Sequence, residues 1–147
     1  AEAKALIEGY FESYPKVKEY MDNVVATARE KGYVETLFGR RRYLADIDSR
    51  NANARALAER NAINAPIQGT AADIIKIAMI RIHRRMKAEG LKAKMILQVH
   101  DELNFSVPKA EKELVQQIVI EEMENAIHLH VPLRADHGWG SNWLEAH

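Results

Sequence analysis

The sequence contains no cysteine, and among its 147 residues there are only 7 glycines and 4 prolines. The lack of cysteine excludes a disulfide scaffold, a thiolate nucleophile and any Cys-ligated zinc or iron–sulfur site, and it fits a cytoplasmic protein. With 47% hydrophobic and 29% charged residues, collagen-like and low-complexity classes are excluded as well. No run approaches the roughly 18 consecutive apolar residues of a membrane span. We therefore expect one globular domain with a sizeable core and no membrane partner.

The charges balance overall but are unevenly distributed. The 21 basic residues equal the 21 acidic ones, yet residues 76–94 hold seven Lys or Arg against one Glu, a local balance of +6. Residues 101–124 hold seven acids against two lysines, a balance of −5. Two interpretations stay open: a surface for a polyanion beside an acidic zone, or two amphipathic helices with differently charged solvent faces.

Helical periodicity dominates the sequence. Pro15 interrupts an apolar pattern that begins near Leu6 and continues to Gly32, which predicts two helices meeting at an angle. A helix from about Ser49 to Asn64 should end at Pro66, and a second should begin at Thr70, where Asp73 follows in a capping-box-like spacing. This second helix should run over residues 71–90, and a further helix is predicted over residues 109–129.

Two segments have the alternation of β-strands. Residues 33–46 predict a short hairpin with Gly39 at its turn. Residues 95–107 alternate apolar and polar side chains on both sides of His100, Asp101 and Glu102, which predicts a hairpin with these three at its tip. Residues 131–135 have the pattern of a last strand. The predicted class is α+β, with helices packed on a small antiparallel sheet whose centre is the 95–107 hairpin.

The tip of that hairpin carries the strongest chemical signal. Asp101 and Glu102 would present hard oxygen ligands at a position fixed by a sheet, which suits Mg²⁺, or Mn²⁺ in its place. Mg²⁺ takes one or two protein carboxylates and completes its shell with water and phosphate oxygens, so phosphoryl chemistry is implied. The residues alone leave a plainer interpretation open, because Asp and Glu are also common at solvent-exposed turns.

Two groups of polar side chains suit nucleic-acid contacts. Arg60 and Asn64, extended past Pro66 by Gln68, form one stripe of side chains that bond phosphate oxygens and base edges. Next to the Gly39 turn stand three further candidates for phosphate contacts, Arg40, Arg41 and Arg42. Taken alone, each group is read more simply as an ordinary solvent-exposed face.

Three stretches together resemble family A DNA polymerases of the bacterial DNA polymerase I type. Residues 98–103, with the sequence QVHDEL, resemble motif C, the hairpin of the palm. Residues 36–42, with the sequence TLFGRRR, resemble a T-L-x-G-R-R-R stretch of that family. Residues 59–76 resemble the helix that precedes the palm hairpin almost residue for residue, and the likeness extends over essentially the whole chain.

The resemblance implies DNA-directed DNA synthesis, in which a dNTP is joined to a primer 3′-hydroxyl by a two-metal mechanism. Asp101 would be a catalytic ligand of Mg²⁺, Glu102 a supporting one, and His100 a contact near the primer terminus. Arg60, Asn64 and Gln68 would line the track of the primer–template DNA. Such contacts must tolerate every sequence, which the acceptors common to all base pairs in the minor groove allow.

The family pattern is incomplete in this sequence. Motif A, with the second metal-binding Asp, and motif B, whose side chains grip the nucleotide, are absent, and Ala1 already lies in a helical pattern. We expect residues 1–147 to be one C-terminal palm and fingers fragment, about 1–65 from fingers to palm and about 66–147 palm, that is inactive without the rest of the polymerase. The alternatives are a non-catalytic nucleic-acid-binding module and a purely structural interaction domain.

Overall fold

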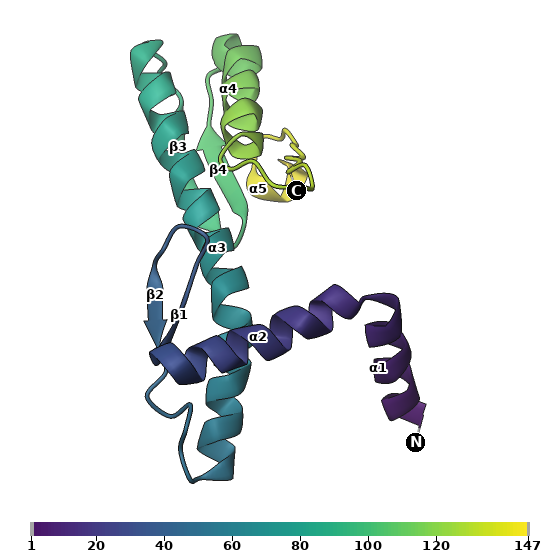
Figure 1. Ribbon diagram of the computed structural model, residues 1–147. Helices are drawn as coiled ribbons and strands as arrows, with labels where there is room; N and C mark the ends of the chain where they lie inside the picture. Colours follow the sequence, from purple (N-terminus) through teal and green to yellow (C-terminus); the bar gives the residue numbers. More distant parts are fainter. Residues whose placement is uncertain (1, 147) are drawn as a thin grey trace. The chain divides into compact units, whose positions relative to one another are not determined.

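The structure, a computed structural model, describes residues 2–146 and divides into two compact units, residues 1–70 and 71–147. Helices predominate, and the described residues hold two separate two-stranded antiparallel sheets rather than one sheet (Figure 1). The predicted α+β class is confirmed. In chain order the elements are α1 (Glu2–Ser13), α2 (Pro15–Lys31), β1 (Tyr33–Glu35), β2 (Arg41–Tyr43), α3 (Ala52–Ala88), β3 (Lys94–Val99), β4 (Glu102–Ser106), the 3₁₀ turn η1 (Lys109–Glu111), α4 (Lys112–Glu124) and α5 (Trp143–Ala146).

The predicted break between the first two helices is confirmed. Pro15 is the first residue of α2, where its missing N–H has no partner to lose and its fixed φ suits a helix. At the other end Gly32 closes α2 with φ of 76° and donates its N–H to the carbonyl of Ala28 at 2.8 Å. That left-handed conformation favours glycine, and the chain then turns directly into β1.

Pro66 does not end a helix, so both the predicted helix end and the predicted new start at Thr70 are wrong. α3 is one helix of 37 residues with Pro66 inside it. An internal proline costs about 3 kcal/mol because it removes one hydrogen bond and crowds the preceding turn. Burial of Ala62 and Ala65 just before this point opposes that cost, and the Tyr20 hydroxyl donates to the carbonyl of Ile63 at 3.0 Å. Tertiary contacts therefore outweigh the local preference.

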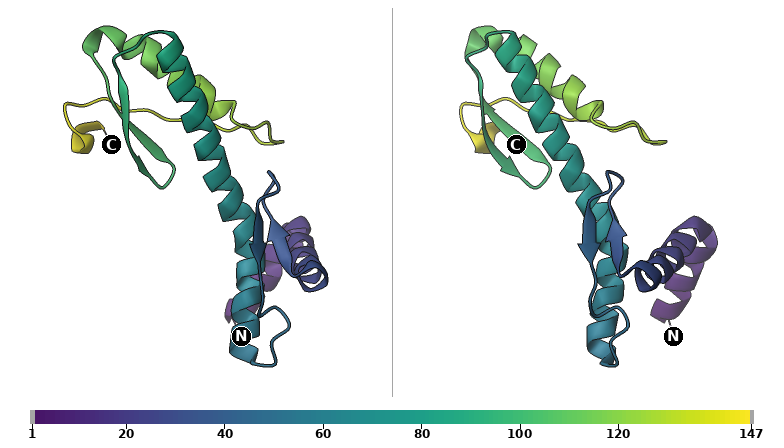
Figure 2. Two further views of the ribbon diagram at one scale, coloured as in Figure 1. Left: turned by 90° about the vertical axis from the view of Figure 1, so that its left-hand side faces the viewer. Right: turned by 60° about the vertical axis from the view of Figure 1, so that its left-hand side comes forward.

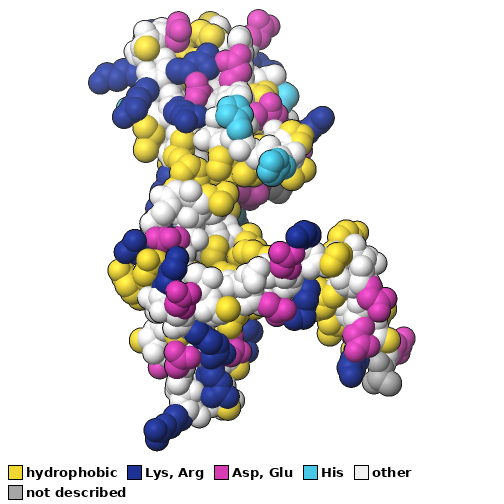
Figure 3. All heavy atoms as spheres, viewed as in Figure 1, with side chains coloured by type: hydrophobic (Ala, Val, Ile, Leu, Met, Phe, Trp, Pro, Cys, Tyr) yellow, Lys and Arg dark blue, Asp and Glu magenta, His cyan; other side chains and the backbone are white. Residues whose placement is uncertain are grey.

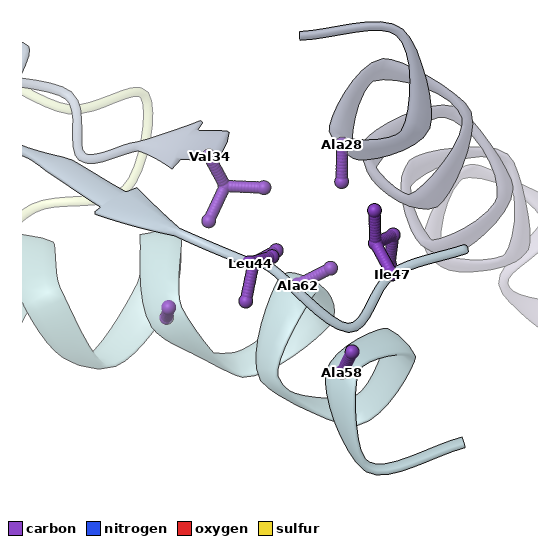
Figure 4. Packing of buried hydrophobic residues seen from close by; sticks show 7 residues of the cluster. Ala28, Val34, Leu44, Ile47, Ala58 and Ala62 are labelled. Atoms are coloured by element: carbon purple, nitrogen blue, oxygen red, sulfur yellow. The ribbon is translucent and has the colours of Figure 1, made fainter. Parts of the chain in front are cut away.

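The core of residues 1–70 lies where α2, the segment around the β1–β2 hairpin and the first half of α3 meet. Figure 4 shows Ala28 from α2 and Ala58 and Ala62 from α3 pointing toward a common centre with larger side chains between them. Arg29 links the same elements at the surface, donating to Asp48 at 3.1 Å and pairing with Glu59. The buried cluster comprises Ala28, Val34, Leu44, Ile47, Ala58, Ala62 and Ala65.

The core of residues 71–147 lies between the second half of α3, the β3–β4 hairpin and α4, which Figure 2 shows beside one another in both views. Arg85 on α3 donates to Glu121 at 2.7 Å and to Glu122 at 3.0 Å on α4, and Arg81 donates to the carbonyl of Asn125 at 2.7 Å. The buried cluster comprises Ala78, Ile82, Met86, Ala93, Val115, Ile118 and Ala126.

Two predictions for the last part of the chain are corrected. α4 ends at Glu124, not near residue 129, and residues 131–135 form no strand. This segment is held by side chains instead of a ladder: Glu124 accepts from the N–H of Ala135 at 3.1 Å, and the indole of Trp139 donates to Gln116 at 2.8 Å. Among residues 2–146 no helix is both long and apolar enough to cross a membrane.

The second core gives a first testable prediction. Ile82→Ala should lower the free energy of unfolding by about 2–5 kcal/mol, because Ile82 is fully buried and its truncation leaves a cavity. Ile80→Ala is the matched control: on the same helix Ile80 is 51% exposed, and its truncation should change stability by no more than about 0.5 kcal/mol. Urea unfolding followed by circular dichroism measures both. Equal losses would contradict the burial pattern of α3.

Candidate active site and nucleic-acid surfaces

The predicted hairpin with the acidic tip is confirmed as β3 and β4, and its turn has a specific geometry. Val99 pairs with Glu102, so His100 and Asp101 form a two-residue turn. His100 has φ of 53°, the only positive φ among the described residues other than glycine. A positive φ in a two-residue hairpin turn is a feature of the primed turn types, whose twist matches that of the flanking strands. The side chain of Gln98 donates to the His100 carbonyl at 3.0 Å.

This turn holds the two carboxylates at fixed places on a sheet. Asp101 is exposed and Glu102 is half-buried at the first position of β4. A register shift between Met95 and Leu97 adds one residue to β3, and such a bulge bends the strand and re-aims the side chains beyond it. The sequence therefore places a carboxylate at the tip, and the ladder fixes its direction.

The carboxylates border a cleft in residues 71–147. It has a volume of about 880 Å³ and lies between the hairpin, α4 and the C-terminal segment. The C-terminal wall includes Asp136, His137 and Trp139, with Lys112 stacked 4.9 Å from the ring centre of Trp139. Near the end of that wall, hydrogen bonds from Ser141 and then Asn142 lower the pKa of the Glu145 carboxyl.

The donors at the tip fit a hard divalent cation in part. Mg²⁺ is bound through one or two carboxylates and keeps positions for water and phosphate oxygens, and Asp101 and Glu102 offer such carboxylates. Among residues 2–146, however, no three His, Asp or Glu side chains come together in a way that could hold a metal ion. Any ion at the tip would need further ligands that these residues do not supply.

The predicted polar stripe lies on the exposed side of α3 within residues 1–70. Arg60, Asn64 and Gln68 are all exposed and follow one another at four-residue intervals, which places them on one helix face. The buried alanines of the first core lie on other positions of the same helix. The continuity of the helix through Pro66 keeps Gln68 in line with the other two.

The three consecutive arginines have different environments. Arg40 donates to the carbonyl of Gly69 at 3.0 Å. Arg41 donates to Glu35, its cross-strand partner, at 2.8 Å and lies 4.5 Å from the ring centre of Tyr33. The hydrogen bond to Glu35 is the main cause that raises the pKa of Arg41.

Arg42 makes no ion pair or side-chain hydrogen bond with residues 2–146. A pocket of about 100 Å³ is bordered by all three arginines and by Gln68, so the structure brings part of both predicted nucleic-acid groups together in one unit. The predicted roles of these residues stay predictions.

Sequence reasoning missed two features of these surfaces. The pairing of Arg41 with Glu35 follows from a hairpin register that the Gly39 turn already implied. The C-terminal wall of the cleft had no such local signal, because residues 136–142 have neither helical nor strand periodicity and the strand pattern of residues 131–135 does not lead to a strand.

Comparisons with known proteins agree on one family. Residues 1–145 match the family model "DNA polymerase family A". The chain is 58% identical over 145 residues to DNA polymerase I of Streptococcus pneumoniae serotype 4, covering 99% of this chain and 16% of that protein. It is 57% identical to DNA polymerase I of Bacillus caldotenax over the same share of each chain. The chain thus spans about a sixth of the length of these relatives.

A solved structure has the same fold. The POL domain of Pol1 from M. smegmatis, in complex with DNA primer-template and dNTP, superposes with a TM-score of 0.97 at 49% sequence identity. The match covers 99% of this chain and 26% of that one.

The contact between the β1–β2 hairpin and α3 gives a second prediction. A Cβ added at Gly69 would lie 2.7 Å from Cγ2 of Thr36, closer than such atoms can approach, so Gly69→Ala should destabilise by about 1–3 kcal/mol. In a Thr36→Ser background Cγ2 is gone, while the hydroxyl that accepts from the N–H of Phe38 and Arg40 is kept.

In that background the added Cβ meets only Nη2 of Arg40, at 3.4 Å, so the helix preference for Ala over Gly dominates and the same change should stabilise by up to about 1 kcal/mol. The four proteins are the parent, Gly69→Ala, Thr36→Ser and the double variant. Chemical denaturation of each measures the coupling between positions 36 and 69. The same sign of effect in both backgrounds would contradict the contact.

Proposed function

The chain belongs to DNA polymerase family A, and we propose that it forms part of a longer DNA-directed DNA polymerase that acts in bacterial DNA replication and repair. The reaction is transfer of a nucleotide from a dNTP to the 3′-hydroxyl of a primer paired with a template. The observation that carries the proposal is the exposed Asp101 on a two-residue turn, followed by Glu102 at the start of β4, in a chain whose relatives are DNA polymerases I. Bacterial relatives and the lack of cysteine support a cytoplasmic site of action.

Asp101 and Glu102 would hold Mg²⁺, or Mn²⁺ in its place, in the complete enzyme. When bound there, such an ion would supply charge to lower the pKa of an attacking hydroxyl and to offset the charge of a triphosphate. The protein's own contribution is position: the paired strands fix where Asp101 stands, and the bond from Gln98 to the His100 carbonyl fixes the turn. Since the catalytic demand is placement within fractions of an ångström, a site on a sheet is better suited than one on a free loop.

The DNA track would use the stripe on α3. Arg60 supplies a forked cation for phosphate or minor-groove acceptors, and Asn64 and Gln68 supply amides that both donate and accept. His100 would contact the primer end, and Arg40 to Arg42 the phosphates. Of these three arginines, Arg42 is the one whose guanidinium makes no bond within residues 2–146, so it is the best suited to a phosphate.

The chain alone should have no polymerase activity. A two-metal site needs carboxylates on both sides of an ion pair, and residues 2–146 hold no group of three suitable side chains. This observation also favours the alternative function, a nucleic-acid-binding module that becomes catalytic only with the remainder of the polymerase. Calorimetric titration with Mg²⁺ tests this dependence: tight binding of two ions to the 147-residue chain would contradict it.

Asp101→Asn in the complete polymerase should reduce nucleotide incorporation by about 100-fold or more. A lost metal ligand removes several kcal/mol of transition-state stabilisation, and each 1.4 kcal/mol is about tenfold in rate. Asp136→Asn is the matched control, because Asp136 is an exposed carboxylate on the same cleft and lies outside the proposed metal ligands. Single-turnover primer extension measures both, and primer–template affinity should stay unchanged. Incorporation within tenfold of the parent protein in Asp101→Asn would overturn the metal role.

Arg60→Ala should weaken binding of primer–template. The slope of log Kobs against log salt should become shallower by about 0.9, the contribution of one phosphate contact. Arg50→Ala removes the same charge from an exposed position that precedes α3 and serves as the control. Fluorescence anisotropy over a range of KCl concentrations gives both slopes. If Arg60→Ala keeps the slope of the parent protein, Arg60 does not contact the DNA backbone.

A further inference from the structure

The excess of positive charge in residues 76–94 is the largest charge feature that the proposed site does not use. Seven Lys or Arg stand against Glu89 alone. Five of the seven lie on α3, all within residues 71–147. Figure 3 shows Lys and Arg side chains gathered over that end of α3.

Two of the helix cations are already engaged in holding the fold. Arg81 donates to the carbonyl of Asn125, and Arg85 to Glu121 and Glu122. The other three, Lys76, Arg84 and Lys87, are exposed and make no ion pair or side-chain hydrogen bond with any residue of the described range 2–146.

These three cations lie on one face of the helix. At 100° per residue they fall within an arc of about 80°, away from the buried residues Ile75 and Ile82. Exposed Ile80 and His83 lie among or beside them, and half-buried Asp73 precedes Lys76 by three residues on the same side. Lys76, Arg84 and Lys87, with Ile80 and His83, are named the basic face.

We infer that the basic face binds the phosphate backbone of duplex DNA, as a contact surface separate from the stripe of Arg60, Asn64 and Gln68. Like charges that lie together on one face repel one another, and Asp73 sets one acid against the three cations there. Binding of DNA is favoured because the cations replace counterions condensed on its phosphates, which are then released. The face is therefore built for an anionic partner. The inference does not require Asp101 to be a metal ligand.

The dimensions of the face favour a nucleic acid over a small anion. Lys76 and Lys87 are 11 residues apart, which spans about 16 Å along a helix axis. At about 3.4 Å per nucleotide of one strand, this corresponds to roughly five nucleotides of B-form DNA. A single phosphate could bridge Arg84 and Lys87, which are three residues apart on the helix, but not Lys76 as well, whereas a strand backbone can contact all three.

The test is the salt dependence of binding to a blunt DNA duplex, which has no single-stranded template beyond its 3′ ends. Replacing all three cations, Lys76→Gln, Arg84→Gln and Lys87→Gln, should make the slope of log Kobs against log salt shallower by about 2.7, since each phosphate contact contributes about 0.9. Between 50 and 200 mM KCl the parent protein should then lose roughly 40-fold more affinity than the variant.

The matched control removes the same total charge elsewhere. Lys4, Lys16 and Lys18 lie in residues 1–70 and are paired with Glu8, Glu19 and Asp22, so replacing them with Gln should leave the slope near that of the parent. Equal changes in both triple variants would show a net-charge effect only and would overturn the inference.

Two further readouts keep the result independent of folding and of the proposed catalysis. A photo-crosslinking residue placed at position 84 should crosslink to the duplex, and one at exposed Glu113 should not. At saturating primer–template, the triple variant of the basic face should keep the nucleotide-incorporation rate of the parent protein. Asp101→Asn should keep the parent's slope of log Kobs against log salt on the blunt duplex. Binding of polyglutamate in place of DNA, or an unchanged slope in the basic-face variant, would overturn the inference.

Discussion

Both hydrophobic cores depend on one element, the 37-residue helix α3. Its first half contributes Ala58, Ala62 and Ala65 to one buried cluster, and its second half contributes Ala78, Ile82 and Met86 to the other. The sides of α3 that remain exposed are therefore determined by these two sets of contacts. The face on which α3 presents an exposed polar residue is thus set by core packing, while side chains such as Arg85 are further directed by their ion pairs.

The parts of the fold that could be predicted from the sequence are those that do not depend on the packing of α3 into the two cores. The hairpin from 94 to 106, the break at Pro15 and the turn at Gly39 follow from local signals, since alternation and special backbone angles act over a few residues. Pro66 shows the limit of such signals. A proline usually ends a helix, but burial of the alanines that precede it stabilises the continuous form, and burial depends on residues such as Leu44 that are distant in sequence.

The candidate site divides in the same way. Asp101 and His100 could be placed on a hairpin tip from alternation, and the resemblance to family A polymerases pointed to their chemistry. The cleft beside them could not be predicted, because its far wall is an irregular segment that contacts α4 through Trp139 and Gln116. A contact between two side chains 23 residues apart leaves no periodic trace in the sequence.

A protein with zero net charge can bind a polyanion if its cations are not all engaged internally. Arg29, Arg41 and Arg85 each pair with carboxylates on neighbouring elements, and these pairs hold the fold together without adding to the field at a distance. What would act on DNA is the remainder: Arg60 on one part of α3 and the basic face on another. The carboxylate of Asp101, which we propose as a metal ligand, repels the same polyanion, so cations elsewhere on the protein must supply the attraction that it cannot. Segregation of charge along the chain, rather than a basic total, is therefore the electrostatic arrangement that an acidic catalytic centre for nucleic acid requires.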